Sequence, residues 1–159
     1  MRRIVIFGNS GAGKSTLARK LSSEHGLAHL DLDTLAWEPT SPPRRRSLES
    51  SAGAVARFVE QKPSWVIEGC YADLLELVVP GCTEMIFLNP GVEACIENCR
   101  ARPWEPHKYA SKAAQDENLE MLIQWVREYE TRDDELSLAS HRRLFESFSG
   151  VKREDGAGA

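Results

Sequence analysis

A lysine and a hydroxyl residue follow closely spaced glycines near the start of the chain. Gly8, Gly13, Lys14 and Ser15 stand at the spacing G-x-x-x-x-G-K-[ST], with Gly11 between the two glycines. Glycines permit positive φ and let backbone N–H groups approach an anion closely. A lysine at this position reaches the β- and γ-phosphates of a nucleotide, and the hydroxyl can ligate Mg²⁺. The spacing therefore predicts a cradle for a polyphosphate.

The residues around this motif predict the two elements that it requires. Residues 4–7 are β-branched and aromatic, which is typical of a buried strand, and a helical pattern runs from Lys14 to a stop at Gly26. Such a helix directs the positive end of its dipole at the same anion. A glycine-rich turn can match the motif by chance, but a strand before it and a helix after it favour nucleotide binding. The predicted phosphate-binding residues are Gly8, Asn9, Ser10, Gly11, Ala12, Gly13, Lys14, Ser15 and Thr16.

Acidic residues lie at the ends of two further strand-like segments. Asp31 and Asp33 end the segment 27–33, and Glu68 stands near the end of the segment 64–69. Residues two apart in an extended chain point to the same side, and acids of this kind gather at the carboxyl ends of strands in open α/β sheets. Each acid alone could be an ordinary turn residue. Together with the glycine motif they indicate a set that holds a metal and activates an acceptor.

Short apolar segments alternate with helical ones along the first hundred residues. The strand-like segments are 2–8, 27–33, 64–69 and 83–90, and the helical ones are 14–26, 47–61 and 91–102. Short continuous apolar strands separated by helices are typical of a parallel sheet covered on both faces. Right-handed crossovers then favour a three-layer, doubly wound α/β fold, and we expect a single domain over residues 1–152.

The second half of the chain is less regular. The segment 102–114 has two prolines and mixed charge and predicts a mobile excursion, whereas a helical pattern returns at Gln115. Residues 141–150 predict either the end of a helix or a last strand. Residues 153–159 have little apolar content, so we expect a disordered tail there.

Residues 1–102 resemble the adenylate-kinase and shikimate-kinase group of small P-loop kinases. The resemblance lies in the segments GNSGAGKSTLARKL, HLDLDTLAWEP, PSWVIEGCYAD and IFLNPGVEACIENCRAR. Within the group it is closest to the kinase-like proteins called DNA topology modulation or flagellar-regulator-related proteins. It implies a five-stranded parallel sheet in the order 2-3-1-4-5, an acceptor-binding segment at about 34–62 and a lid at about 103–114.

The resemblance also implies roles for individual residues. Asp31 would support Mg²⁺, and Asp33, the second acid of a D-x-D pair, would meet the acceptor hydroxyl. Glu68 would hold a metal-bound water, and Arg100 and Arg102 would contact the nucleotide and neutralise the transferring phosphoryl group where the lid begins. The implied metal ligands are Ser15, Asp31 and Glu68, and the implied catalytic residues are Lys14, Asp33 and Arg100.

Three adjacent arginines lie in the expected acceptor segment. Arg44, Arg45 and Arg46 could grip a phosphate or carboxylate through bidentate hydrogen bonds, and a solvated basic patch is an equal alternative. Trp37 could stack on a flat substrate or line the core or the cleft. We therefore expect Asp33, Trp37 and the three arginines to bind a small acceptor that is anionic or carries a hydroxyl.

The composition is that of an ordinary globular protein. Hydrophobic residues make up 42% and charged residues 28% of the chain, and the net charge of −4 gives no support to a nucleic-acid or membrane-surface partner. No apolar run approaches the ~18 residues that span a bilayer, and no signal peptide is visible, so we expect a cytoplasmic protein. The four cysteines favour buried thiols over a metal site or a disulfide.

These observations lead to two hypotheses for the function. The first is ATP- and Mg²⁺-dependent phosphoryl transfer to a small molecule, which rests mainly on positioning and electrostatics. The second is a nucleotide-binding regulatory NTPase that acts through a protein partner. The D-x-D pair and the lid arginines favour the first, because a simple switch does not need them.

Overall fold

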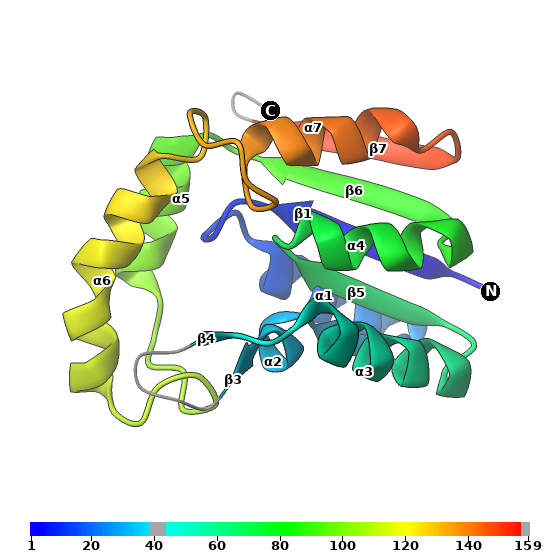
Figure 1. Ribbon diagram of the computed structural model, residues 1–159, viewed down its shortest axis with the longest axis horizontal. Coiled ribbons are helices and arrows are strands. Elements are labelled where there is room, and N and C mark those ends of the chain that lie inside the picture. Colours follow the sequence, from blue (N-terminus) through cyan, green and yellow to red (C-terminus); the bar gives the residue numbers. More distant parts are fainter. Residues whose placement is uncertain (39–43, 157–159) are drawn as a thin grey trace.

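Five strands of the chain form one parallel sheet (Figure 1). The computed structural model describes residues 1–38 and 44–156. The strands of the sheet are β1 (Arg3–Gly8), β2 (Ala28–Asp31), β5 (Trp65–Gly69), β6 (Glu84–Asn89) and β7 (Val151–Gly156). Their spatial order is β2-β5-β1-β6-β7. This is the predicted order 2-3-1-4-5 when only these strands are counted along the chain, and the predicted α/β fold class is confirmed.

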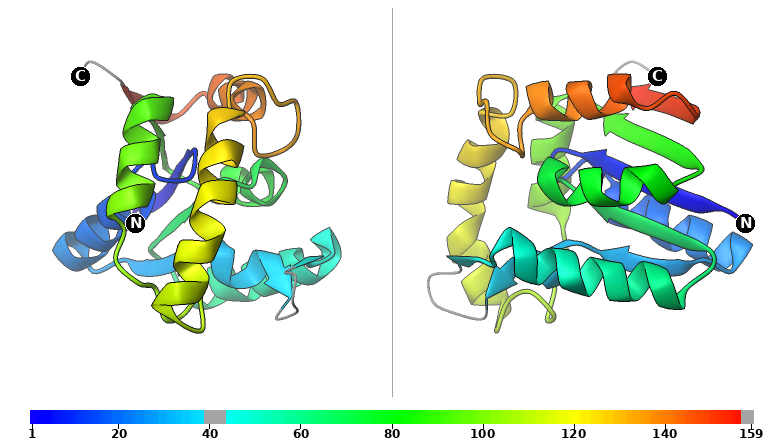
Figure 2. Two further views of the ribbon diagram at one scale, coloured as in Figure 1. Left: turned by 90° about the vertical axis from the view of Figure 1, so that its left-hand side faces the viewer. Right: turned by 45° about the vertical axis from the view of Figure 1, so that its right-hand side comes forward.

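The side chains of the central strand divide the core between two faces of the sheet. Val5 and Phe7 pack with helices α3 (Leu48–Gln61), α4 (Ala72–Val78) and α7 (Leu138–Ser147), whereas Ile4 and Ile6 pack with α1 (Lys14–His25). All four side chains are fully buried. Burial on both faces explains why this strand reads as a continuous apolar run. Figure 2 shows the sheet between these layers of helices.

Helices α5 (Val92–Ala101) and α6 (Lys112–Arg127) pack together beside the phosphate-binding motif (Figures 1 and 2). They share a small buried cluster with Ala12 of the motif. The hydroxyl of Ser111 caps α6 by accepting a hydrogen bond from the backbone N–H of Ala114. Residues 112–114 of the expected lid therefore belong to α6, and the loop between the two helices is residues 102–111.

The end of the described chain forms an edge strand, so the expectation of disorder from residue 153 is wrong for residues 153–156. Strand β7 pairs in parallel with β6, with Val151 opposite Glu84. Its Glu154 accepts a hydrogen bond from Asn89 and pairs with Arg142 of α7. Ladder hydrogen bonds and surface ion pairs can hold an edge strand whose side chains stay exposed, so composition carries no signal for it. Residues 157–159 lie outside the described residues.

Short elements that the sequence analysis did not predict follow β2 and β5. Helix α2 (Asp33–Ala36) leads into a hairpin of β3 (Trp37–Glu38) and β4 (Arg44–Arg45), and α4 continues into a turn of 3₁₀ helix, η1 (Val79–Gly81). Residues 39–43 of the expected acceptor segment lie outside the described residues. Within residues 1–38 and 44–156, no helix has both the length and the apolar character needed to cross a bilayer.

A buried histidine joins the last helix to the chain after β5. The Nε2 atom of His141 lies 2.7 Å from the carbonyl oxygen of Cys70, and its Nδ1 atom lies 2.6 Å from the hydroxyl of Tyr129. A carbonyl oxygen only accepts hydrogen bonds, so Nε2 carries the proton and Tyr129 donates to Nδ1. Burial lowers the pKa of His141 to about 4. The neutral ring packs at a steep angle to the rings of Phe7 and Phe87 and therefore holds α7 against the sheet.

We expect His141 to make the fold less stable in mild acid. The pKa of this histidine falls from 6.5 to about 4 on folding, so between these values the unfolded chain binds the additional proton. The stability present above pH 6.5 is therefore lost as the pH falls toward 4, by roughly 3 kcal/mol in total. Urea unfolding of the wild type and of His141→Gln at several pH values between 7 and 4.5 measures this contribution.

The variant should be less stable at pH 7, because it loses buried hydrogen bonds, but its stability should fall less steeply with acid. His25→Gln is the matched control, since it makes the same change of residue at an exposed position at the end of α1. Parallel slopes for the wild type and His141→Gln would contradict the expectation.

Candidate functional site

The glycines of the predicted phosphate-binding loop have the backbone conformation that the motif requires. The φ angles of Gly8, Gly11 and Gly13 are 154°, 83° and 96°. A Cβ atom on Gly8 would lie 2.2 Å from the carbonyl oxygen of Leu88, and one on Gly11 would lie 2.3 Å from that of Cys95, whereas one on Gly13 would meet nothing within 4 Å. The first two glycines therefore make room for β6 and α5 of the protein itself, and only Gly13 faces open space where a ligand could approach.

Hydrogen bonds from two neighbouring helices fix the loop. The side chain of Asn9 is buried, donates to the carbonyl of Val126 at the end of α6, and accepts from the backbone N–H of Ser10. The side chain of Asn98 in α5 donates to the carbonyl of Gly11 at 2.8 Å. The loop is thus preformed, which lowers the entropy lost when an anion binds. No motif in the sequence identified Asn98.

The two polar residues that end the motif face different partners. The ammonium of Lys14 donates to the carbonyl of Asn9 at 2.7 Å and so lies across the loop. The hydroxyl of Ser15 donates to Oε1 of Glu68 at 2.9 Å, and Oε2 of the same carboxylate lies 2.7 Å from Nε2 of His29. Glu68 is buried at the end of β5. The next residue, Thr16, is exposed on α1.

The predicted metal ligands lie at one edge of the sheet. Asp31 at the end of β2 is the register partner of Glu68 on β5, and Ser15 contacts that glutamate directly. A hydroxyl and two carboxylates are hard oxygen donors and fit Mg²⁺. Among the described residues, no three His, Cys, Asp or Glu side chains form a metal cage. The set therefore fits a Mg²⁺ that also takes oxygens from substrate phosphates.

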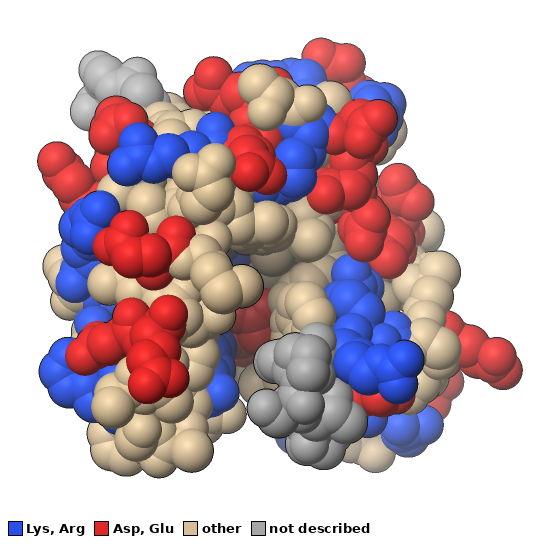
Figure 3. All heavy atoms as spheres, turned by 60° about the vertical axis from the view of Figure 1, so that its left-hand side comes forward, with Lys and Arg blue, Asp and Glu red and all other residues tan. Residues whose placement is uncertain are grey.

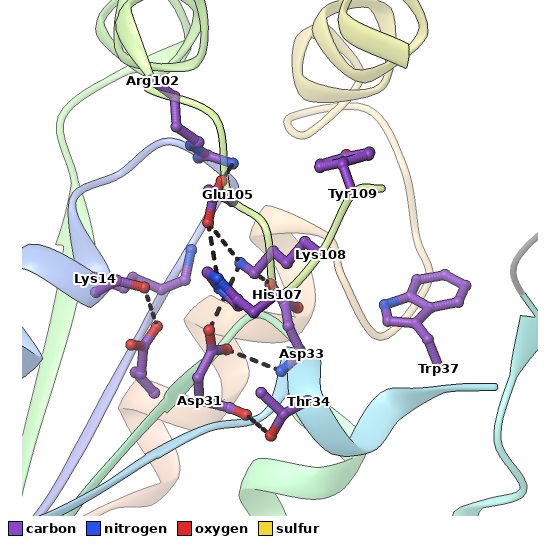
Figure 4. Close-up of polar contacts among 12 residues, drawn as sticks. Lys14, Asp31, Asp33, Thr34, Trp37, Arg102, Glu105, His107, Lys108 and Tyr109 are labelled. Carbon is purple, nitrogen blue, oxygen red and sulfur yellow. Dashed lines mark hydrogen bonds and ion pairs between the residues drawn. The ribbon is translucent and has the colours of Figure 1, made fainter. Parts of the chain in front are cut away.

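The D-x-D pair contacts a lysine from the loop between α5 and α6 (Figure 4). The ammonium of Lys108 lies 2.8 Å from Oδ2 of Asp33, 3.6 Å from Oδ2 of Asp31 and 3.4 Å from Oε2 of Glu105. Strand β2 ends at Asp31 and Asp33 begins α2, so the predicted extended segment ends two residues earlier. The two acids therefore face one cation for a different reason. The backbone N–H of Asp33 donates to Oδ1 of Asp31 at 2.9 Å and holds this turn. No local pattern in the sequence pairs Lys108 or Glu105 with these acids.

The two acids have opposite pKa shifts. Burial, with repulsion from Asp33 and Glu68, raises the pKa of Asp31. Burial also acts to raise the pKa of Asp33, but the charge and hydrogen bond of Lys108 outweigh it and hold that pKa below its usual value. Asp33 is therefore ionised at neutral pH and can accept a hydrogen bond from an acceptor hydroxyl.

Two aromatic residues support Asp33 from the side of the expected acceptor. The hydroxyl of Tyr71 donates to Oδ1 of Asp33, and the indole N–H of Trp37 donates to the tyrosine oxygen at 2.8 Å. Tyr71 is buried, whereas Trp37 is 38% exposed and its indole edge with the N–H is turned toward the cluster in Figure 4. Trp37 thus orients a buried tyrosine to which the sequence analysis assigned no role, and its contact with an acceptor stays a prediction.

Two of the three arginines that are predicted to bind the acceptor contact other residues of the protein. Arg45 pairs with Asp73 at 3.3 Å and Glu135 at 3.1 Å, and its guanidinium lies over the ring of Tyr71. The Nε atom of Arg46 donates to the carbonyl of Trp37. These two arginines therefore hold the hairpin and its neighbours in place, and Arg44 is exposed on β4. The partners of Arg45 are 28 and 90 residues away, which a local pattern cannot show.

The two predicted lid arginines lie in different surroundings. Arg100 is half exposed and pairs with Glu120 of α6 at 3.3 Å, on the outside of the helix pair. Arg102 lies 3.4 Å from Oε1 of Glu105, which also contacts Lys108 (Figure 4). The structure thus connects Arg102 to the acidic cluster and gives Arg100 a partner elsewhere.

Charges of both signs are mixed over the end of the molecule that bears the site. Figure 3 shows lysine and arginine interspersed with aspartate and glutamate on this face, without a broad field of one sign. The local arrangement of a few charges therefore matters more for binding than a long-range field.

No protein-family model matches the sequence, and no curated protein matches it. Solved structures with a similar fold include a sugar kinase from Janibacter sp. HTCC2649 in its unliganded form, with 15% identity, a TM-score of 0.54, and coverage of 97% of this chain and 85% of that one. Another is shikimate kinase from Bacteroides thetaiotaomicron, with 20% identity, a TM-score of 0.50, and coverage of 91% and 97%. At these identities the similarity shows the fold alone.

We expect alanine at Gly11 and at Gly13 to have different effects. Both positions have positive φ, which costs about 1–2 kcal/mol for alanine, but only the Cβ at position 11 collides with the backbone of α5. Gly11→Ala should therefore lower the free energy of unfolding by at least ~1 kcal/mol more than Gly13→Ala. Urea unfolding of both variants measures this difference. Equal losses in the free energy of unfolding would contradict the expectation that the loop packs tightly against α5.

Proposed function

We propose that the protein transfers the γ-phosphoryl group of ATP to a hydroxyl group of a small molecule, with Mg²⁺ as cofactor. The observation that carries the proposal is the meeting of two groups of residues at the carboxyl ends of β1, β2 and β5. A preformed glycine loop with Lys14 and Ser15 lies on one side, and Asp33 lies on the other. Asp31 and Glu68 stand between them on adjacent strands. A donor and an acceptor site that share an edge are what phosphoryl transfer requires.

The residues of the chain divide the work of the reaction. The N–H groups of the loop and the ammonium of Lys14 would bind the β- and γ-phosphates. Ser15, Asp31 and Glu68 would hold Mg²⁺, which when bound offsets the charge of the phosphates. Asp33, oriented by Tyr71, would accept a hydrogen bond from the acceptor hydroxyl and align it. Its lowered pKa suits orientation more than early proton removal, and phosphoryl transfer needs little of the latter.

The acceptor proposed here is a small molecule with a free hydroxyl. The pairing of Arg45 with two carboxylates argues against a strongly anionic one, because the charge of this arginine is already engaged by the protein. The exposed ring of Trp37 offers an apolar face beside the carboxylate of Asp33. The names of the two similar structures, a sugar kinase and a shikimate kinase, agree with this class of acceptor. The resemblance of the segments quoted above supports, as part of this proposal, a relation to the DNA topology modulation proteins.

The test is the release of ADP from Mg-ATP in the presence of nucleosides, nucleotides, sugars and hydroxy acids, one at a time. We expect a hydroxyl compound of low charge to stimulate release. Lys14→Ala should reduce the stimulated rate at least about 100-fold, because a cation that follows the migrating charge is lost. Lys20→Ala on the exposed side of α1 is the matched control and should keep the rate.

A slow release of ADP that no acceptor changes would instead favour a regulatory NTPase. Full activity of Lys14→Ala would contradict the assignment of the loop itself.

A further inference from the structure

One ammonium group in the structure is surrounded by carboxylates that the proposed reaction needs. Lys108 contacts Asp31, Asp33 and Glu105 within 3.6 Å, and its side chain is only 21% exposed. The first two acids belong to the end of β2 and the start of α2. The lysine comes instead from the loop 102–111, and Figure 4 shows it between the acids and this loop.

The loop that carries Lys108 is a formed structure. The indole N–H of Trp104 donates to the carbonyl of Tyr109, and the backbone N–H of Lys108 donates to the carbonyl of Glu105. Gln115 of α6 accepts from the backbone N–H of Glu105 at 2.8 Å. These bonds tie the loop to itself and to α6, whereas the ion pairs of Lys108 join it to the D-x-D pair. The ammonium is therefore presented by a structured lid.

The charges around the acids show why a cation is needed there. Asp31, Asp33, Glu68 and Glu105 bring four carboxylates to the place where the γ-phosphate of a nucleotide would arrive. Lys14 lies on the side of the glycine loop, and a metal at Ser15 and Glu68 would lie next to it. On the acceptor side, Lys108 is the cation that the described structure places against Asp33, since Arg100 pairs with Glu120 on the outer surface.

We propose that Lys108 is a catalytic residue of the phosphoryl transfer inferred above, and this proposal rests on that function. Before nucleotide binds, Asp31 and Asp33 hold its ammonium. Asp31 is one of the residues that would hold Mg²⁺. With nucleotide bound, Lys108 would turn from Asp31 to the equatorial oxygens of the phosphoryl group in transfer and stay beside Asp33. Lys108 thus takes the role that the sequence analysis assigned to Arg100.

The proposed step balances without a further reactant. The acceptor oxygen forms a bond to the γ-phosphorus, the bond between this phosphorus and the bridging oxygen of ADP breaks, and ADP leaves with that electron pair. The proton of the acceptor hydroxyl passes to Asp33. Lys108 keeps its proton throughout and supplies only charge and hydrogen bonds, which act mainly in the transition state.

The first measurement compares the kinetics of Lys108→Met and Lys112→Met. Lys112 pairs with Asp116 within α6 and is 71% exposed, so its replacement removes the same charge close by but away from the acids. With the acceptor found above, Lys108→Met should lower kcat at least about 100-fold and change the KM for ATP less than about threefold. Lys112→Met should behave as the wild type, and Lys108→Arg should recover part of kcat.

The second measurement does not depend on turnover. Affinities for Mg-ADP and for Mg-ADP with aluminium fluoride, a mimic of the phosphoryl group in transfer, are determined by calorimetry. Lys108→Met should weaken binding of the mimic at least tenfold more than binding of Mg-ADP. In the ligand-free protein, hydrogen exchange of the amides of residues 104, 105 and 107–109 should become faster in Lys108→Met and remain unchanged in Lys112→Met. If the methionine variant does not fold, Lys108→Gln replaces it in both measurements.

The outcomes separate this proposal from the function on which it rests. If the wild type is active and Lys14→Ala is not, but both measurements on Lys108→Met match Lys112→Met, the role of Lys108 is overturned and the kinase function stands. If the wild type binds no nucleotide, both fall. A loss of kcat with equal weakening of Mg-ADP and of the mimic would assign Lys108 to nucleotide binding and overturn its catalytic role.

Discussion

The structure depends on the confinement of one loop, residues 8–13, between the sheet and the pair α5–α6. Gly8 and Gly11 allow the carbonyls of Leu88 and Cys95 to approach so closely that no side chain fits. Asn98 and the buried Asn9 then fix the path of the loop from two helices. Because the N–H groups are already fixed in the ligand-free protein, little conformational entropy would be lost when an anion binds. Every other part of the proposed site is placed relative to this loop.

The edge of the sheet next to the loop gathers carboxylates that repel one another. Asp31 and Glu68 are neighbours on β2 and β5, and Asp33 lies two residues after Asp31, at the start of α2. Such a cluster is stable only when cations or hydrogen-bond donors meet it. In the structure these are Ser15, His29, Tyr71 and Lys108. These carboxylates need positive charge nearby, which supports the proposed binding of a metal and the proposed role of Lys108.

Further contacts stabilise the segments next to these carboxylates. Arg45 joins the hairpin to α4 and to the segment before α7 through Asp73 and Glu135, and its guanidinium covers Tyr71. His141 binds the carbonyl of Cys70, two residues after Glu68. Arg45 and His141 have side chains that often bind ligands, but here they stabilise the fold. A buried polar group needs a hydrogen-bond partner inside the protein.

The elements with local signals could be predicted from the order of the residues. Residues 4–7 predict a buried strand, residues 8–15 predict a glycine-rich loop between a strand and a helix, and the alternation of strands and helices predicts a doubly wound sheet, since periodicity and chirality act over short stretches. Which charges meet depends on the fold of the whole chain. It paired Lys108 with Asp31 and Asp33, engaged Arg45 and Arg100 elsewhere, and formed β7 from a polar tail. Ion pairs and ladder hydrogen bonds join residues far apart in the chain, and no local pattern specifies their partners.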